Sequence, residues 1–120
     1  MSILIVDDSK AMRMIVRRAL RQAGYHQDVT EACSGVEALK AVESGGFEVI
    51  LCDWNMPEMN GLDLLGKLKE LGRQIKFGFV TSECSVDVQK LAREAGALFF
   101  ITKPFSPDVF RSVLEPILGN

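Results

Sequence analysis

Side chains able to bind a metal ion or a phosphate follow four short apolar stretches of this 120-residue sequence. They are Asp7 and Asp8 after the first stretch, then Asp53, Thr81 and Lys103. Three carboxylates brought close together repel one another, so a cation must compensate them. Lys103 supplies one fixed positive charge, and Mg²⁺ or Mn²⁺ matches an all-oxygen set of ligands without His or Cys.

An Asp that follows a strand can also serve as a helix N-cap or as a turn residue. Helix capping does not explain a Lys placed directly before a Pro, as Lys103 is. The recurrence of such residues at equivalent places in successive units therefore favours a binding site over the structural interpretation.

Strands and helices that would hold these residues alternate along the chain. Short runs rich in Val, Ile and Phe predict strands at 3–6, 29–32, 49–52, 77–80 and 98–101. Apolar residues at helical spacing after each run predict five helices. The run at 29–32 is the weakest, but the runs ILIV, VILC and FGFV are continuously apolar, which indicates an α/β fold with a doubly wound parallel sheet. Ligands bind to such sheets at the carboxyl ends of the strands, where the polar residues lie.

Capping residues mark the ends of the predicted helices. Ser34 with Glu37 and Asn60 with Asp63 have the spacing of capping boxes, and Ser106 precedes a Pro suited to a first helical turn. Glycines follow three predicted helices, at Gly24, Gly72 and Gly96.

The composition predicts one domain over residues 1–120, reduced and cytoplasmic. A net charge of −2 argues against a nucleic-acid partner. Cys33, Cys52 and Cys84 form no C-x-x-C pair, so neither a disulfide framework nor a zinc site is expected. The first apolar run is too short to cross a membrane or to direct export. The chain stops after the fifth helix, so we expect no attached effector domain.

Four motifs resemble those of a known family. They are VDDS at 6–9, DWNMPEMNGL at 53–62, VTSE at 80–83 and KPF at 103–105. They look like the receiver domain of two-component response regulators, of the single-domain chemotaxis CheY-like type, across essentially the whole chain. The resemblance implies a five-stranded (βα)5 flavodoxin-like fold with strand order 2-1-3-4-5, the known order of CheY itself.

The resemblance also implies roles for the acidic residues. Asp53 would be the phosphoacceptor, a nucleophile that takes a phosphoryl group from a phosphohistidine of a sensor kinase. Asp8 and Asp53 would hold Mg²⁺ together with the backbone carbonyl of Asn55, and Asp7 would act mainly through a water molecule.

Thr81 and Lys103 would bind the phosphoryl oxygens. Thr81 and Phe100 would form a switch that reshapes the surface of the fourth helix, the last strand and the fifth helix for a downstream protein target. The implied partners also include a histidine kinase or phosphotransfer domain and a phosphatase. Flagellar-motor regulators carry Tyr where this chain has Phe100 and a basic residue where it has Val113, so the motor switch and other targets both stay open.

Two functions from different classes fit the acidic residues. The first is a phosphorylation-dependent binding module that catalyses only its own phosphorylation and dephosphorylation. The alternative is a Mg²⁺-dependent small-molecule phosphatase with an Asp nucleophile. Such phosphatases usually need an Asp two residues after the nucleophile as general acid, and Asn55 cannot donate that proton. The signalling module is therefore favoured.

Two other features concern the surroundings of the site. Lys10, Arg13, Arg17 and Arg21 form a basic stripe that is either a solvated helix face or a docking surface for an acidic kinase domain or phosphatase. Trp54 directly follows the predicted nucleophile, and we expect it to be half-exposed.

Overall fold

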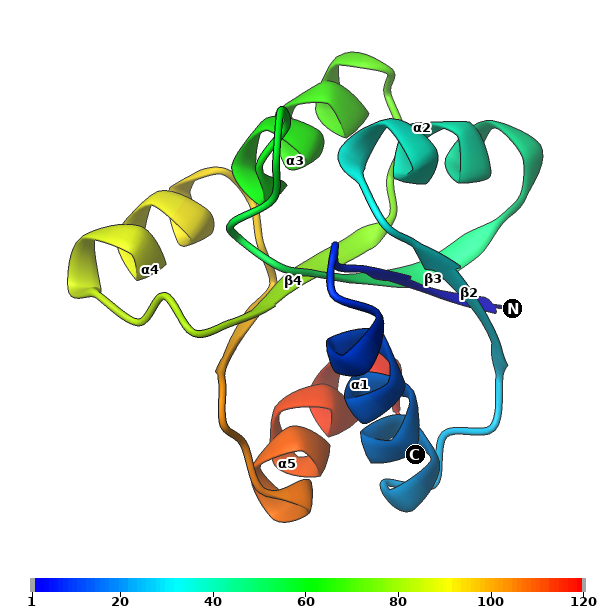
Figure 1. Cartoon of the computed structure of the whole chain (residues 1–120), viewed down its shortest axis with the longest axis vertical. Helices are drawn as coiled ribbons and strands as arrows, with labels where there is room; N and C mark the ends of the chain where they lie inside the picture. The colour runs from blue at the N-terminus through cyan, green and yellow to red at the C-terminus, as the bar shows by residue number, and fades with distance from the viewer. Residues whose placement is uncertain (1, 120) are drawn as a thin grey trace.

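The computed structural model describes residues 2–119 as five strands that alternate with five helices (Figure 1). The strands are β1 (Ser2–Val6), β2 (Asp28–Ala32), β3 (Phe47–Cys52), β4 (Lys76–Thr81) and β5 (Phe99–Thr102). The helices are α1 (Lys10–Gln22), α2 (Gly35–Ser44), α3 (Gly61–Glu70), α4 (Val86–Glu94) and α5 (Pro107–Leu118). All strand pairs are parallel and their order is β2-β1-β3-β4-β5, which confirms the predicted topology.

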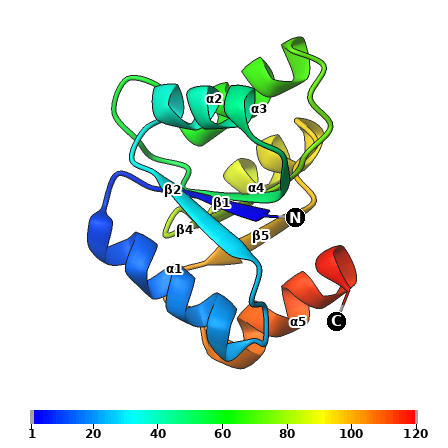
Figure 2. The same ribbon diagram turned by 90° about the vertical axis from the view of Figure 1, so that its right-hand side faces the viewer.

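The sheet is covered on both faces. Helices α1 and α5 lie on one side, and α2, α3 and α4 lie on the other (Figures 1 and 2). Successive residues of β1 alternate between two buried clusters, with Leu4 packed toward the three-helix side and Ile3 and Ile5 toward α1 and α5. Burial on both faces accounts for the unbroken apolar runs of the sequence.

The strand bounds differ slightly from the predicted runs. Strands β1, β2 and β4 each begin one residue earlier, at Ser2, Asp28 and Lys76, because ladder hydrogen bonding continues past the apolar pattern. Strand β3 begins at Phe47 for the same reason. Strand β5 begins one residue later than predicted, and Leu98 is exposed before it.

The predicted helix ends are confirmed with one adjustment. Asn60 and Asp63 form the reciprocal capping box at the start of α3. At α2, the Ser34 hydroxyl accepts from the Glu37 backbone N–H at 3.1 Å, but the Glu37 carboxylate accepts from the N–H of Cys33 at 2.9 Å. The three glycines predicted after helices all have a positive φ, as left-handed caps require: Gly24 at 94°, Gly72 at 71° and Gly96 at 105°.

Within residues 2–119, no helix is both long and apolar enough to cross a bilayer.

Candidate functional site

Three carboxylates meet where β1 and β3 end. Val6 pairs with Cys52 in the sheet register, and the Asp53 N–H donates to the Val6 carbonyl at 2.9 Å. This register places Asp7 and Asp53 side by side, and Asp8 follows on the loop into α1. One carboxylate oxygen from each of the three acids lies within 4.8 Å of the others. The predicted convergence is confirmed, and such an all-oxygen cluster could hold a hard cation.

Lys103 points into this acidic cluster from the loop after β5. Its Nζ lies 3.0 Å from Asp7 Oδ2 and 3.6 Å from Asp53 Oδ2. The Lys103 backbone N–H donates to the Thr81 carbonyl at 2.8 Å, which fixes the loop against the end of β4. The peptide bond between Lys103 and Pro104 is cis. The ammonium therefore compensates part of the negative charge.

The Asp53 carboxylate is largely withdrawn from water. Burial raises the pKa of Asp53 above its ordinary value, while hydrogen bonding to the Thr81 side chain and the Lys103 charge oppose that rise. The nearby Asp7 charge raises the pKa of Asp53 further. The backbone N–H of Trp54, which donates to Asp53 Oδ1 at 2.8 Å, lowers that pKa. The ionised carboxylate is thus short of compensating charge, which is the condition that a bound cation relieves.

The loops after β3 and β4 are joined beside Asp53 by a contact that the sequence did not predict. The Asn55 side-chain amide donates to Glu83 Oε1 at 3.0 Å, and the Glu83 N–H donates to the Thr81 hydroxyl at 3.2 Å. Thr81 itself is buried. The VTSE motif contained Glu83, but only the folded arrangement of the two loops reveals its partner.

Gly61 is a second feature of the site that sequence reasoning missed. A methyl group on its Cα would overlap the backbone carbonyl of Asp53 and the ring of Phe79. The first turn of α3 therefore packs directly beneath the candidate nucleophile, and only glycine permits this approach.

Comparisons with known proteins agree with this geometry. The family model for the response regulator receiver domain matches residues 3–115. This chain belongs to that family. Chemotaxis protein CheY1 of Helicobacter pylori is 42% identical over 123 aligned residues, which cover 100% of this chain and 98% of that protein. Chemotaxis protein CheY of Pseudomonas aeruginosa is 38% identical over 119 residues, covering 98% and 95%.

Solved structures show the same fold. Chemotaxis response regulator CheY4 of Vibrio cholerae matches with a TM-score of 0.85 at 30% identity, covering 98% of each chain. The chain is thus a response regulator receiver domain, a regulatory module of two-component signalling. This membership favours the signalling interpretation over the small-molecule phosphatase.

The receiver domain buries Trp54, so the expected half-exposure is wrong. Trp54 is 9% exposed and lies in the core cluster on the α3 side of the sheet. Its ring centroid is 5.0 Å from that of Phe79, and Phe79 is 6.0 Å from Phe100. These aromatic contacts link the residue after Asp53 to the predicted switch residue on β5.

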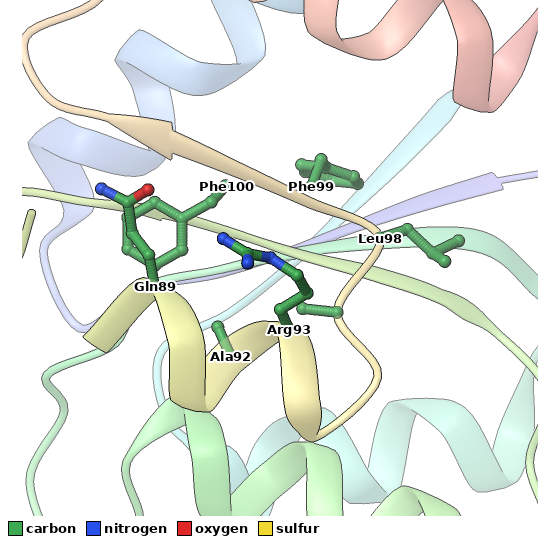
Figure 3. A pocket seen from close by; sticks show the side chains of 7 residues that line it. Gln89, Ala92, Arg93, Leu98, Phe99 and Phe100 are labelled. Atoms are coloured by element: carbon green, nitrogen blue, oxygen red, sulfur yellow. The ribbon is translucent and has the colours of Figure 1, made fainter. Parts of the chain in front are cut away.

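Phe100 lies beside a pocket between α4 and β5. Figure 3 shows Phe100 and Arg93 directed toward this space, whereas Phe99 lies on the opposite side of the strand. The pocket has a volume of about 200 Å³ and is also lined by Gln89 and Ala92. Phe100 is only partly buried, so its ring has room on the α4 side.

The basic stripe on α1 is largely engaged within the domain. Arg13 and Arg17 both pair with the Glu31 carboxylate of β2, at 2.9 and 2.8 Å. Arg21 donates to the carbonyls of Tyr25 and Gln27 at 2.8 and 2.9 Å. Guanidinium groups with these partners stabilise the fold, so the structure supports a structural role rather than a docking surface.

An apolar groove opens directly beside the acidic cluster. Its volume is about 320 Å³, and it is lined by residues of α1 and of the loops after β4 and β5: Met12, Ile15, Ser82, Lys103, Pro104 and Phe105. The ring of Phe105 stacks on that of Phe110 with centroids 5.0 Å apart, which holds this wall in place. Lys103 belongs to both the groove and the cluster.

Proposed function

We propose that this receiver domain accepts a phosphoryl group on Asp53 from a phosphohistidine of a histidine kinase or phosphotransfer domain. An Asp53 carboxylate oxygen would form the new bond to phosphorus while the nitrogen–phosphorus bond breaks and the electron pair returns to the histidine. One observation carries the proposal. Asp53 lies in a cluster of three carboxylates with Lys103 Nζ 3.6 Å from its Oδ2, a site that neutralises charge around a nucleophile.

The acidic residues fit a magnesium ion. Carboxylates of Asp8 and Asp53 and the backbone carbonyl of Asn55 would hold Mg²⁺, with Asp7 acting through water. When bound, the ion supplies positive charge to the phosphoryl oxygens. The oxygen ligands of this cluster are those that Mg²⁺ prefers.

Other residues of the chain orient and stabilise the transferred group. The Lys103 ammonium and the Thr81 hydroxyl would donate hydrogen bonds to phosphoryl oxygens. The domain would catalyse only its own phosphorylation and dephosphorylation. The Asn55 amide, held by Glu83, offers no acidic proton to a leaving group, which argues against turnover of small phosphoesters.

The output surface of the proposed switch is formed by α4, β5 and α5. In the sheet register Phe79 pairs with Phe100, two residues before Thr81 pairs with Thr102. A displacement of Thr81 toward a phosphoryl group would therefore act on strand residues next to Phe100. These elements and the residue before β5 carry several exposed large apolar side chains that a protein target could cover: Val86, Leu91, Leu98 and Val109.

The apolar groove beside Lys103 is the proposed contact for the phosphodonor. A donor histidine must approach Asp53 closely, so its protein must cover the surface next to the cluster. The exposed Ile15 and the groove residues Met12 and Phe105 offer an apolar contact there. The donor domain would therefore present an apolar surface there rather than the acidic surface considered as a partner for the basic stripe.

The relatives suggest the pathway. Proteins named as chemotaxis proteins align over nearly the whole chain at 38–42% identity, so we place this regulator in chemotaxis signalling. Its target is a protein bound through the α4-β5-α5 surface. A flagellar motor switch, a dedicated phosphatase, a cytoplasmic location and a single domain over residues 1–120 stay predictions.

Phosphorylation by a small acyl phosphate tests the proposal. Intact-mass measurement should show one added phosphoryl group in the presence of Mg²⁺, and none after chelation. Asp53→Asn keeps the shape and removes the nucleophile, so it should remain unlabelled. Labelling of Asp53→Asn at the wild-type rate would falsify the assignment.

The same sample tests the switch by NMR. Chemical shifts should change on phosphorylation in the ranges 86–95 and 98–113 as well as around Asp53. Changes confined to the pocket would leave the phosphoacceptor assignment intact and rule out the proposed output surface.

A further inference from the structure

Arg13 connects the acidic loop to two neighbouring elements. Its Nη1 donates to the backbone carbonyl of Asp7 at 2.7 Å, and its Nε donates to Glu31 Oε1 at 2.9 Å. The Arg13 side chain is only 14% exposed. One rigid guanidinium therefore ties the start of α1 to the end of β1 and to β2.

Arg17 provides an internal comparison. It sits one helical turn later and pairs with the other oxygen of the same carboxylate, Glu31 Oε2, through Nε at 3.1 Å and Nη2 at 2.8 Å. Arg13 and Arg17 thus share the Glu31 partner, but the contact with the Asp7 carbonyl belongs to Arg13.

The Asp7 carbonyl matters because it belongs to the peptide that joins Asp7 to Asp8. That peptide is planar, so fixing its oxygen fixes the direction in which the chain leaves Asp7. The Asp7 carboxylate is held separately, by the Ser9 N–H at 2.9 Å and Lys103 Nζ at 3.0 Å. Asp8 is exposed, and its position depends on the backbone that carries it.

We propose that Arg13 is a positioning residue for the divalent-cation site. By holding the Asp7–Asp8 peptide, it presents the Asp8 carboxylate to the space shared with Asp53, and Glu31 holds Arg13 in the orientation that does so. This inference rests on the proposed metal site and adds a residue that touches neither the ion nor the phosphoryl group.

Charge and position predict effects of opposite sign. A guanidinium near the cluster repels a bound cation, so electrostatics alone predicts that removing Arg13 strengthens Mg²⁺ binding. Loss of positioning predicts weaker binding, because groups that orient ligands contribute roughly 10-fold to 100-fold to metal affinity. The direction of the change therefore separates the two effects.

The test is Mg²⁺ titration of metal-free protein, followed by the fluorescence of Trp54 and by calorimetry. Trp54 is the single tryptophan of the chain and directly follows Asp53, to which its backbone N–H donates, so its fluorescence follows the site without any phosphorylation. Arg13→Met should bind Mg²⁺ about 10-fold more weakly than wild type. The matched control Arg17→Met, which spares the Asp7 carbonyl, should bind unchanged or slightly more tightly.

Arg13→Lys keeps the charge but lacks the fork that reaches both partners, so it should also bind Mg²⁺ more weakly. It serves as the test variant if thermal denaturation shows that Arg13→Met does not fold. Binding by Arg13→Met or Arg13→Lys as tight as that of Arg17→Met would overturn the positioning role. Failure of the wild-type protein to bind Mg²⁺ would instead overturn the proposed metal site, and the positioning role with it.

Discussion

Replacing Lys103 by Met tests how the acidic cluster is compensated. The change removes the ammonium that lies 3.0 Å from Asp7 and 3.6 Å from Asp53, and it keeps an apolar stem of similar length in the groove. Asp7 is 4% exposed, so water cannot replace the lost charge fully. The metal-free variant should therefore be less stable than wild type, and more dependent on an added cation.

The size of the effect follows from distance and burial. At an effective dielectric constant of about 20, unit charges at these separations attract by roughly 5 kcal/mol for each pair, before the desolvation of the groups is subtracted. Removing one partner of a buried pair costs about 3–5 kcal/mol. The side chains of Lys103 and Asp53 are 13% and 14% exposed, so residual solvent screens the pair. We expect a loss of about 2–3 kcal/mol, or about 10 °C in melting temperature for a domain of this size.

Thermal denaturation with and without Mg²⁺ measures both consequences. The ion should restore much of the lost stability, so the Mg²⁺-induced rise in melting temperature should be larger for the variant than for wild type. Lys76→Met is the matched control, because Lys76 contacts the carbonyl of Ile117 at the far end of β4. Equal metal-free stability of Lys103→Met and wild type, or weaker Mg²⁺ binding by the variant, would refute the compensating role.

Two further predictions concern pH. Burial raises the pKa of Asp53, so its ionised form destabilises the metal-free fold at neutral pH. Asp53→Asn should then increase the free energy of unfolding in chelator at pH 7, and urea titrations should show that gain shrinking as pH falls through the raised pKa. A gain independent of pH would contradict the assignment. A hydrogen bond from Arg17 lowers the pKa of Glu31; burial opposes this shift, and Arg13 assists it. The ionised Glu31 therefore stabilises the fold at pH above its ordinary pKa of 4.5, and this stabilisation is lost as pH falls below it. Glu31→Gln should cost about 0.5–1 kcal/mol at neutral pH and nothing in strong acid, and an unchanged cost in acid would argue against the ion pairs.

The sequence predicted the features that depend on topology. Parallel strands bring their carboxyl ends to one edge, so residues after β1, β3, β4 and β5 had to approach one another wherever those strands are neighbours. Asp7, Asp8 and Asp53 meet as predicted, because they follow the neighbouring strands β1 and β3. Lys103 follows β5, which does not neighbour either strand, and it reaches the cluster through its long side chain.

The features that the sequence missed depend on side-chain contacts between separate loops. Glu83 reaches Asn55 across 28 positions, and no local pattern marks either residue as the other's partner. Arg13 belongs to a regular basic stripe, and its contact with the Asp7 carbonyl distinguishes it from Arg17 only after folding. The burial of Trp54 was within reach of sequence reasoning, because successive residues at a strand end point to opposite sides.

The resting contacts of Thr81 set the scale of the proposed switch. Its hydroxyl accepts from the Glu83 N–H at 3.2 Å, so a phosphoryl group must replace an interaction that already exists. A phosphoryl group can shift the equilibrium only by the difference between its contacts in the two states. A hydrogen bond to a charged group contributes about 1.5–3 kcal/mol, against roughly 1 kcal/mol for a neutral one. Exchanging a neutral hydrogen bond for one to the charged phosphoryl group would therefore change the ratio of the two states by about fivefold. A steeper response requires Lys103 to change partners together with Thr81.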